Sequence, residues 1–385
     1  MIAPQYPFHE FKHEFHTIQE LIDWAGHTYH DHDAFRFYQG AQIVSKTYGE
    51  FLLDVQCAGR FFATCCSPQD HIAIVGNTSY LWMVAWAGAV SAGFVAVPVD
   101  RLLSEDDIAF LLKQADVSVL VFDASCVGMI AAMQDKCPQI NYICMNGQNL
   151  GNMRFDMGIQ EQKNAEKPTW INKVLPQDVA EIVFTSGTTG SYKGCVLTHD
   201  NLAWNAMNGS SYVALTPEKK TLSILPIHHT LEITAGLLTP FCSGVTICIN
   251  DSLRNIQRNL NVFHPECMIA VPMVVEMLYK NIWITAKRFG KEKILHMALH
   301  SVMILTVTSA KRRSTLVKAV FISGSRWRMY MPAANLKRSL KCWKRCGRDC
   351  AQILCVWAIC PIACRMAFFR RITKRMPRCD VSRRF

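Results

Sequence analysis

The chain has 385 residues, of which 50% are hydrophobic and 18% are charged, and its formal net charge is +11 at pH 7. This length and apolar content allow a substantial buried core, and the sequence shows no internal repeat, which argues against a repeat protein. The first residues, MIAPQYPFHEFKHEFH, are charged and contain no long apolar core, so they indicate a cytoplasmic protein without a secretory signal or a disulfide scaffold.

The first third of the chain alternates between apolar runs and helical segments. The segment HIAIVGNTSYLWMVAWAGAVSAGFVAVPVD predicts a buried strand, a helix and a second buried strand that ends at Pro98. Ser104 can cap a helix that begins at Glu105, and Val117 to Phe122 form the next apolar strand. This alternation predicts an α/β fold with parallel strands. The polar stretch from about Asn146 to Asp178 has no sustained period and predicts a surface connection.

The stretch IVFTSGTTGSYKG, from Ile182 to Gly194, combines hydroxyl groups, glycines and a lysine. The apolar runs on both sides, which end at Phe184 and begin again at Cys195, predict a loop between two strands. Glycines let main-chain N–H groups approach an anion, hydroxyl groups donate hydrogen bonds, and a lysine adds a compact positive charge. The segment therefore predicts a polyphosphate-binding loop.

Two other interpretations of this stretch are disfavoured. The spacing is not that of a Walker A loop, in which a glycine and a lysine are adjacent and a Ser or Thr follows. A solvated Ser/Thr/Gly linker is the second alternative, but linkers rarely lie between two apolar strands with a lysine at the far end.

The stretch resembles the phosphate-binding motif of the adenylate-forming (AMP-binding) superfamily, which usually runs YTSGTTGxPKG and is followed by T-H-x-N-L. This chain has FTSGTTGSYKG and then CVLTHDNL. Tyr192 stands where the family commonly has proline, which removes the fixed φ of proline but no group expected to contact phosphate. The run KTYGEFLLDVQCAGRFF, with Tyr48 and Phe51, resembles the helix after the family's first hairpin. The resemblance implies the N-terminal adenylation-domain fold of acyl-CoA synthetases, with stacked sheets and helices.

The resemblance is closest to long-chain fatty acid–CoA ligases and implies an ATP-dependent reaction. A fatty acid carboxylate attacks the α-phosphorus of ATP, with Mg²⁺ present, and pyrophosphate leaves; the thiol of CoA then attacks the acyl-adenylate. No catalytic residue and no metal ligand is assigned. The residues implied to hold the phosphates are Thr185, Ser186, Gly187, Thr188, Thr189, Gly190 and Lys193.

Two later segments extend the resemblance. In LPIHHTLEITAGLLTPFCSGVTICI, His229 occupies the place of a family histidine near the acyl pocket, and the alternative is a packed histidine bonded to the backbone. No carboxylate partner can be assigned to it, so an acid or base role is not supported. His199 is predicted to begin a helix rather than to take part in the chemistry. FHPECMIAVPMVVEMLYKNIW, with Pro265 and Pro272, resembles the family segment in which a strand leads into a helix beside the substrate tunnel.

The resemblance ends at Ser325. The family continues to an adenine-binding Y-G-x-T-E segment, a ribose-binding aspartate and a domain with a catalytic lysine, and none of these can be placed after Ser325. Residues 326–385 hold 16 of the 41 Lys and Arg residues but 2 of the 30 Asp and Glu residues, so they carry +14 and residues 1–325 carry −3. We therefore expect a partial AMP-binding domain over residues 1–325 and a basic, cysteine-rich, poorly folded tail over residues 326–385. Out-of-frame translation from near Ser325 would produce such a tail, and the gene sequence would show it.

The tail has alternatives. Cys342, Cys346 and Cys350 are spaced four apart, but zinc sites usually pair cysteines two to four apart with a second distant pair or with histidines, and the tail has no histidine, so zinc binding is disfavoured. The apolar run Ala351 to Cys364 is shorter than the about 20 residues that a membrane helix needs, and Pro361 interrupts it. Peripheral contact of the arginines with an anionic membrane, and nonspecific contact with nucleic acid, are the alternatives to a poorly folded tail. No specific nucleic-acid partner is expected.

Two functional hypotheses follow. The first is a fatty acid–CoA ligase that uses ATP, Mg²⁺ and CoA. The second is a non-enzymatic remnant with at most weak nucleotide or acyl binding. Because the adenine, ribose and lysine elements are missing, we expect this chain not to form acyl-adenylate at a useful rate.

Overall fold

The computed structural model describes residues 13–147, 153–165, 169–186, 192–212 and 215–297. The chain divides into a larger unit, Phe8–Met268, and a second unit that includes Ile269–Phe385. The tail expected from Arg326 onward lies outside the described residues, so the boundary at Ser325 stays a prediction.

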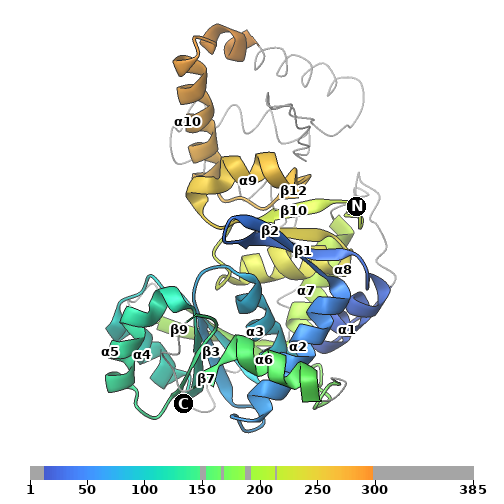
Figure 1. Cartoon of the computed structure of the whole chain (residues 1–385), viewed down its shortest axis with the longest axis vertical. Helices are drawn as coiled ribbons and strands as arrows, with labels where there is room; N and C mark the ends of the chain where they lie inside the picture. The colour runs from blue at the N-terminus through green and yellow to red at the C-terminus, as the bar shows by residue number, and fades with distance from the viewer. Residues whose placement is uncertain (1–12, 148–152, 166–168, 187–191, 213–214, 298–385) are drawn as a thin grey trace, which may run out of the picture. The chain divides into compact units, whose positions relative to one another are not determined.

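The larger unit contains a seven-stranded sheet with the strand order β7-β6-β5-β3-β4-β8-β9, of which Figure 1 labels β3, β7 and β9. Neighbouring strands are parallel, except β8 and β9, which form an antiparallel hairpin. The predicted α/β fold with parallel pairing is therefore confirmed. The strands are β3 (His71–Val75), β4 (Val95–Val99), β5 (Val117–Phe122), β6 (Asn141–Cys144), β7 (Met153–Arg154), β8 (Val179–Ser186) and β9 (Tyr192–Thr198).

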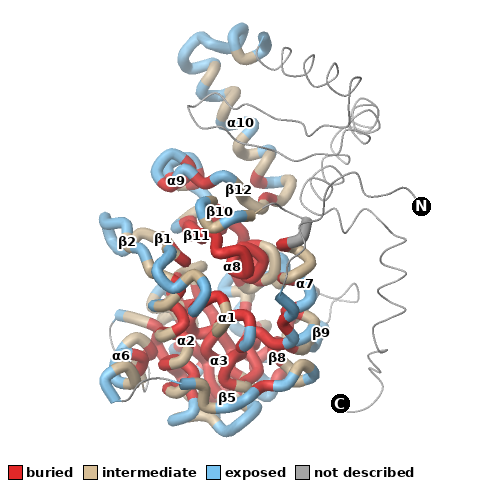
Figure 2. The backbone as a smooth tube through the Cα atoms, turned by 90° about the vertical axis from the view of Figure 1, so that its right-hand side faces the viewer, coloured by how far each residue is buried: buried red, intermediate tan, exposed pale blue. Residues whose placement is uncertain are grey.

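Helices cover both faces of this sheet, because alternate residues of its strands point to opposite sides. Ile72 and Ile74 of β3 enter one hydrophobic core, whereas Ala73 and Val75 enter the other. The first core includes residues of α1 (Ile18–Thr28), α2 (Tyr48–Ala63), α3 (Tyr80–Ser91), α6 (Phe155–Ala165) and α7 (His199–Tyr212). The second includes residues of α4 (Glu105–Gln114), the 3-10 turn η1 (Ala124–Cys126) and α5 (Val127–Lys136). Figure 2 shows α2 and α3 among the most buried parts of the chain.

A five-stranded sheet, in the order β12-β10-β11-β1-β2, completes the larger unit. Its strands are β1 (Asp33–Gln39), β2 (Gln42–Thr47), β10 (Lys220–Ser223), β11 (Thr246–Ile249) and β12 (Cys267–Met268). Its helical segments are the π-helix η2 (Glu232–Leu238), α8 (Thr239–Cys242), the 3-10 turn η3 (Leu253–Asn255) and α9 (Ile256–Phe263). The hydroxyl of Tyr48, at the start of α2, donates a 2.9 Å hydrogen bond to the Val245 carbonyl oxygen, just before β11.

Capping side chains mark the starts of α1, α2, α3 and α4. Ser104 caps α4, since its hydroxyl accepts a 3.2 Å hydrogen bond from the Asp107 N–H. The surface connection predicted for residues 146–178 is partly wrong, because β7 and α6 form within it. Phe155 and Ile159 of α6 are buried, so packing against the rest of the chain stabilises a helix whose sequence is mostly polar.

Helices α2 and α3 approach each other through small residues, which gives a testable prediction. A Cβ atom on Gly88 of α3 would lie 2.5 Å from the Ala58 Cβ and 3.2 Å from the Val55 carbonyl oxygen. Alanine is the better helix former, but there is no space for it, so Gly88→Ala is expected to lower the free energy of unfolding by about 1–3 kcal/mol. Urea denaturation measures this difference.

The matched control for Gly88 is Gly128→Ala in α5. A Cβ atom on Gly128 meets no atom within 4 Å. This substitution is therefore expected to stabilise the protein, by about 0.4–1 kcal/mol. A Gly88→Ala variant as stable as the Gly128→Ala variant would show that α2 and α3 do not pack as closely as described.

The described part of the second unit consists mainly of α10 (Pro272–Arg288). The helix begins with Pro272 in its first turn, where the missing N–H has no helical partner to lose. The predicted strand before this helix is β12, so the expected strand and helix are both confirmed. No helix in the described ranges is both long and apolar enough to cross a membrane.

Candidate functional site

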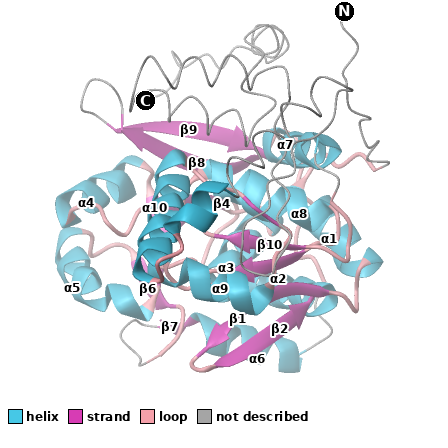
Figure 3. Cartoon of the chain, turned by 90° about the horizontal axis from the view of Figure 1, so that it is seen from above, coloured by secondary structure: helices cyan, strands magenta, loops and turns pink. Residues whose placement is uncertain are grey.

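The β8–β9 hairpin carries the segment predicted to bind phosphate (Figure 3). Thr185 pairs with Lys193 in its ladder, and the Thr185 hydroxyl donates a 3.5 Å hydrogen bond to the Lys193 carbonyl oxygen. Both residues are exposed. Because paired residues of a ladder point to the same face, the two side chains leave the same face of the hairpin near its end.

The other residues predicted to bind phosphate are described only in part. Ser186 is the last residue of β8 and pairs with Tyr192, but its side chain lies outside the described part of the structure. Gly187, Thr188, Thr189 and Gly190 lie outside it altogether. Their role in binding phosphate therefore stays a prediction, as do the roles of Thr185 and Lys193.

The end of β8 and the start of β9 lie at the carboxyl edge of the parallel sheet. Strands β4 and β8 are parallel, with Ala96 beside Glu181, so the end of β8 lies next to the end of β4. The helix after β3 packs in the first core and the helix after β4 packs in the second. The chain therefore leaves the neighbouring strands β3 and β4 toward opposite faces of the sheet. In open α/β sheets, ligands bind at such a switch point.

Two histidines reach this edge from the segment after β10. The His228 Nε2 atom lies 3.6 Å from a carboxylate oxygen of Asp100, which directly follows β4. Burial lowers the pKa of His228 to about 4, although the Asp100 carboxylate acts in the opposite direction. His229 is exposed, and its ring centroid lies 4.3 Å from that of His228. The structure thus places His228, and not only the predicted His229, beside the end of β4; an acyl pocket at His229 stays a prediction.

Tyr192, the departure from the family's proline, contacts α4. Its ring centroid lies 6.5 Å from that of Phe110, and its hydroxyl hydrogen-bonds to the Asp107 carboxylate. Desolvation, followed by the charge of Asp107, raises the pKa of Tyr192. The first residue of β9 is thus tethered to a helix that follows β4. This contact joins residues 85 positions apart and is not readable from the sequence.

Two buried carboxyl groups near this region were not predicted. Glu232, at the start of η2, accepts a 2.5 Å hydrogen bond from the Ser223 hydroxyl, and burial raises its pKa to about 7. Glu181, in β8, is fully buried, and both of its carboxyl oxygens find no hydrogen-bond partner among the described residues. Burial raises the pKa of Glu181 to about 8. The sequence does contain a signal for these two buried carboxyl groups, because Glu181 and Glu232 are each a single acidic residue within an otherwise apolar run.

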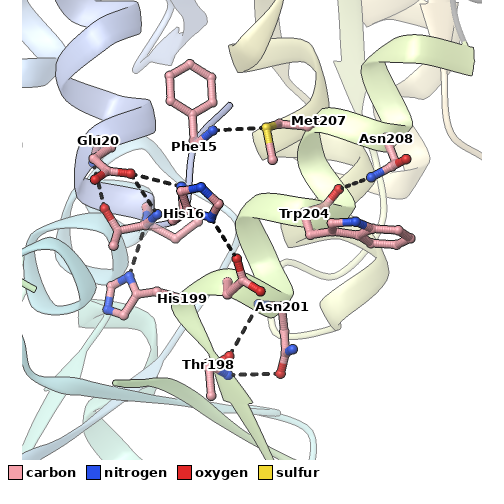
Figure 4. Close-up of polar contacts among 12 residues, drawn as sticks. Phe15, His16, Glu20, Thr198, His199, Asn201, Trp204, Met207 and Asn208 are labelled. Carbon is pink, nitrogen blue, oxygen red and sulfur yellow. Dashed lines mark hydrogen bonds and ion pairs between the residues drawn. The ribbon is translucent and has the colours of Figure 1, made fainter. Parts of the chain in front are cut away.

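The residues of the T-H-x-N part of the motif contact other parts of the chain and cap a helix (Figure 4). The Thr198 N–H donates to the Asn201 side-chain oxygen at 3.2 Å, and the Asn201 N–H donates to the Thr198 hydroxyl at 3.3 Å, so the two residues cap α7. His199 begins α7 as predicted, and its Nδ1 atom accepts a 3.2 Å hydrogen bond from the Ile18 N–H. Burial lowers the pKa of His199 to about 4, so it is neutral at pH 7.

No group of three or more His, Cys, Asp or Glu side chains in the described ranges is arranged to hold a metal ion. The structure therefore assigns no protein ligand to Mg²⁺, and Mg²⁺ and CoA stay predictions. The described groups that suit ATP are the exposed hydroxyl of Thr185 and the exposed ammonium group of Lys193.

Comparison with known proteins identifies the family. The AMP-binding enzyme family matches residues 22–357 of this chain. The long-chain-fatty-acid–CoA ligase FadD15 of Mycobacterium bovis is 28% identical over 235 residues, which are 60% of this chain and 39% of that protein. A crotonobetaine/carnitine–CoA ligase of Salmonella paratyphi B is 24% identical over 272 residues, 68% of this chain and 52% of that protein.

The fold agrees with this match. The crystal structure of ATP-bound MatB from Rhodopseudomonas palustris matches with a TM-score of 0.58 and 21% identity, over 68% of this chain and 50% of that one. This chain spans 39% and 52% of the lengths of the two curated relatives above. Both the sequence match, which covers most of the chain, and the fold lead to one conclusion: the chain belongs to the AMP-binding enzyme family.

Proposed function

We propose that the chain carries the phosphate-binding half of an ATP-dependent acid–CoA ligase site. The observation that carries this proposal is the position of the β8–β9 hairpin, which brings Thr185 and Lys193 to the carboxyl edge of the sheet next to β4. A curated relative is named for long-chain fatty acids and another for crotonobetaine and carnitine. Both names describe carboxylic acids joined to CoA, and a carboxylic acid, in particular a fatty acid, is the substrate class that we propose here.

The proposed reaction has two steps. A carboxylate oxygen attacks the α-phosphorus of ATP, and the bond to pyrophosphate breaks. The thiol sulfur of CoA then attacks the acyl carbon, its proton is lost, and AMP leaves as the thioester forms. Both steps place negative charge on the phosphate oxygens of the leaving group, so their rates depend on groups that position phosphate and stabilise charge. Lys193 would supply positive charge, and Thr185 with the loop that follows would supply hydrogen-bond donors.

Lys193→Ala is expected to weaken the binding of Mg·ATP. A hydrogen bond to a charged group contributes about 1.5–3 kcal/mol, which corresponds to about a tenfold to hundredfold rise in the dissociation constant. Isothermal titration calorimetry with the full chain measures it. The control is Lys113→Ala, since Lys113 is an exposed lysine in the last turn of α4, away from the carboxyl edge. Equal affinities of the Lys193→Ala variant and the unmodified chain would reject the proposed phosphate site.

The remnant hypothesis requires a separate measurement. Residues 326–385 contain no Y-G-x-T-E segment, and on this ground we propose that the chain binds ATP without forming acyl-adenylate at a useful rate. ATP–pyrophosphate exchange with a panel of fatty acids is expected to stay at background. Exchange that is present, and that Lys193→Ala abolishes, would instead establish an active ligase.

A further inference from the structure

A buried carboxyl group closes the base of the loop that carries the two histidines. This β10–η2 loop comprises residues 224–231, between Ser223 at the end of β10 and Glu232 at the start of η2. The Ser223 hydroxyl donates its 2.5 Å hydrogen bond to the Glu232 carboxyl across this base, and Glu232 is 1% exposed. The Ser223 carbonyl oxygen in turn accepts a 3.0 Å hydrogen bond from the Asn250 N–H, just after β11. The two ends of the loop are therefore joined to each other and to the five-stranded sheet.

The backbone of η2 leaves space for this carboxyl group. A Cβ atom on Gly236 would lie 2.5 Å from the Glu232 carboxyl carbon and 2.7 Å from each of its oxygens. The carboxyl group therefore packs directly on the helix backbone four residues further along the chain, and any larger residue there would displace it. The segment is a π-helix, a rare form that occurs often at functional sites. The position of the carboxyl group is thus fixed from two sides, by the Ser223 hydroxyl and by the backbone at Gly236.

The β10–η2 loop brings His228 and His229 to the carboxyl edge of the seven-stranded sheet. The His229 N–H donates a 3.1 Å hydrogen bond to the Pro226 carbonyl oxygen, and the His229 carbonyl oxygen accepts one of 2.9 Å from the Glu232 N–H. The His228 side chain is 14% exposed, and its Nε2 atom lies 3.6 Å from a carboxylate oxygen of Asp100. Because the turn at the histidines ends on Glu232 itself, a shift of Glu232 would move both imidazole rings relative to the end of β4.

We propose that Glu232 is a positioning residue of the ligase site, which holds the β10–η2 loop so that His228 and His229 border the bound nucleotide. Because the Glu232 carboxyl group is buried, it acts through the two histidines and not by contact with a substrate. The inference rests on the proposed function for what the histidines border, whereas the hold on the loop is testable without nucleotide. The Ser223 hydroxyl needs only an acceptor, so an amide oxygen can replace the carboxyl oxygen. The acceptor of residue 232, and not its charge, is therefore what holds the loop.

Diethyl pyrocarbonate, which reacts with exposed neutral imidazoles, is the probe for this loop. Peptide mass spectrometry of the full chain measures the labelling of each histidine. In the unmodified chain the exposed His229 is expected to react readily, and the largely buried His228 is expected to be protected. Glu232→Met keeps a long unbranched side chain without an oxygen acceptor. It is expected to speed the labelling of His228 about tenfold, since loss of a buried hydrogen bond favours local opening. Glu232→Gln should leave this labelling unchanged.

Two further variants test the cause of the protection. Gly236→Ala adds a Cβ atom that would displace the Glu232 carboxyl group, although alanine is the better helix former, and it is expected to speed the labelling of His228 as Glu232→Met does. The matched control is Tyr80→Phe, which removes the buried 2.6 Å hydrogen bond from Tyr80 to Asp54 and should leave His228 protected. Equal protection of His228 in Glu232→Met and in the unmodified chain would overturn the proposal. Equal loss of protection in Glu232→Met, Glu232→Gln and Tyr80→Phe would overturn it as well.

Labelling with Mg·ATP present separates this inference from the proposed function. Where calorimetry shows Mg·ATP bound, a saturating concentration is expected to slow the labelling of His229 in the unmodified chain, and to slow it less in Glu232→Met. Bound Mg·ATP that leaves the labelling of His229 unchanged would overturn the place assigned to the histidines. Absence of Mg·ATP binding would instead reject the proposed phosphate site, while the labelling without nucleotide decides whether Glu232 holds the loop.

Discussion

Glu181→Gln is expected to stabilise the folded protein strongly at about pH 8.5 and only slightly at about pH 5. The Glu181 carboxyl is fully buried in β8 and has no hydrogen-bond partner among the described residues, and burial raises its pKa from 4.5 to about 8. Well below its unfolded-state pKa of 4.5 the carboxyl is protonated in both the folded and the unfolded state. At a pH between the unfolded-state pKa of 4.5 and the folded-state pKa of about 8, the folded state keeps the proton that the unfolded state releases.

The direction of the pH effect follows from this proton balance. Raising the pH from about 4.5 to about 8 lowers the free energy of unfolding by about 1.4 kcal/mol per pH unit, and the loss is complete above the folded-state pKa. Between about pH 5 and about pH 8.5 the loss is on the order of 4 kcal/mol. Glutamine has a similar shape and does not ionise, so the variant should lack this part of the pH dependence.

Urea denaturation at the two pH values measures the effect. The matched control is Glu161→Gln in α6, where the side chain is exposed, and this variant should keep the pH dependence of the unmodified chain. Parallel pH dependences for Glu181→Gln and the unmodified chain would mean that the Glu181 carboxyl is solvated in the folded state.

Lys163→Met is expected to lower the free energy of unfolding by about 2–3 kcal/mol. Lys163 of α6 forms an ion pair with Asp54 of α2, and the second oxygen of Asp54 accepts a 2.6 Å hydrogen bond from the hydroxyl of Tyr80 in α3. The Asp54 side chain is 7% exposed, so removal of the lysine leaves a carboxylate without its counter-charge in a largely buried place. The lysine is 24% exposed, which is why the expected loss falls below the 3–5 kcal/mol typical of fully buried pairs.

Two further variants separate the ion pair from the packing of the lysine stem. Asp54→Asn combined with Lys163→Met removes both charges and should recover part of the lost stability, since a neutral amide is less costly to bury. Lys46→Met breaks a surface pair with Glu50, in which the nitrogen and oxygen lie 3.2 Å apart, and should change stability by about 0–1 kcal/mol. Equal losses for Lys163→Met and Lys46→Met would show that water reaches Asp54.

The α6 helix also shows why its segment was misjudged from the sequence. Its residues are mostly polar, so neither a sustained apolar period nor strong caps marked it. In the structure Phe155 is buried in the first core, and a Cβ atom on Gly158 would lie 2.2 Å from the ring of Phe61. The helix thus depends on contacts with α2, which lies about a hundred positions earlier in the chain. Such contacts decide local structure wherever intrinsic preference is weak.

The candidate site, too, could be predicted from the sequence only in part. Local signals place a loop between two strands at Ile182 to Gly194 and the start of α7 at His199, because apolar runs and capping residues act over a few positions. They do not show that Tyr192 contacts Asp107, or that His228 lies 3.6 Å from Asp100. Those contacts depend on the order of strands in the sheet, which brings the ends of β4 and β8 together.

By itself the sequence determined the α/β class, the strands and helices with strong periodicity or caps, and the motif that indicates the AMP-binding family. These features arise from residues close together in the chain. Only the tertiary structure decided which carboxyl groups are buried, that α6 forms, and that the Ser223 hydroxyl donates to Glu232. The physical reason is that desolvation and side-chain contact depend on neighbours in space, and those neighbours come from distant parts of the chain or from the exact geometry of a turn.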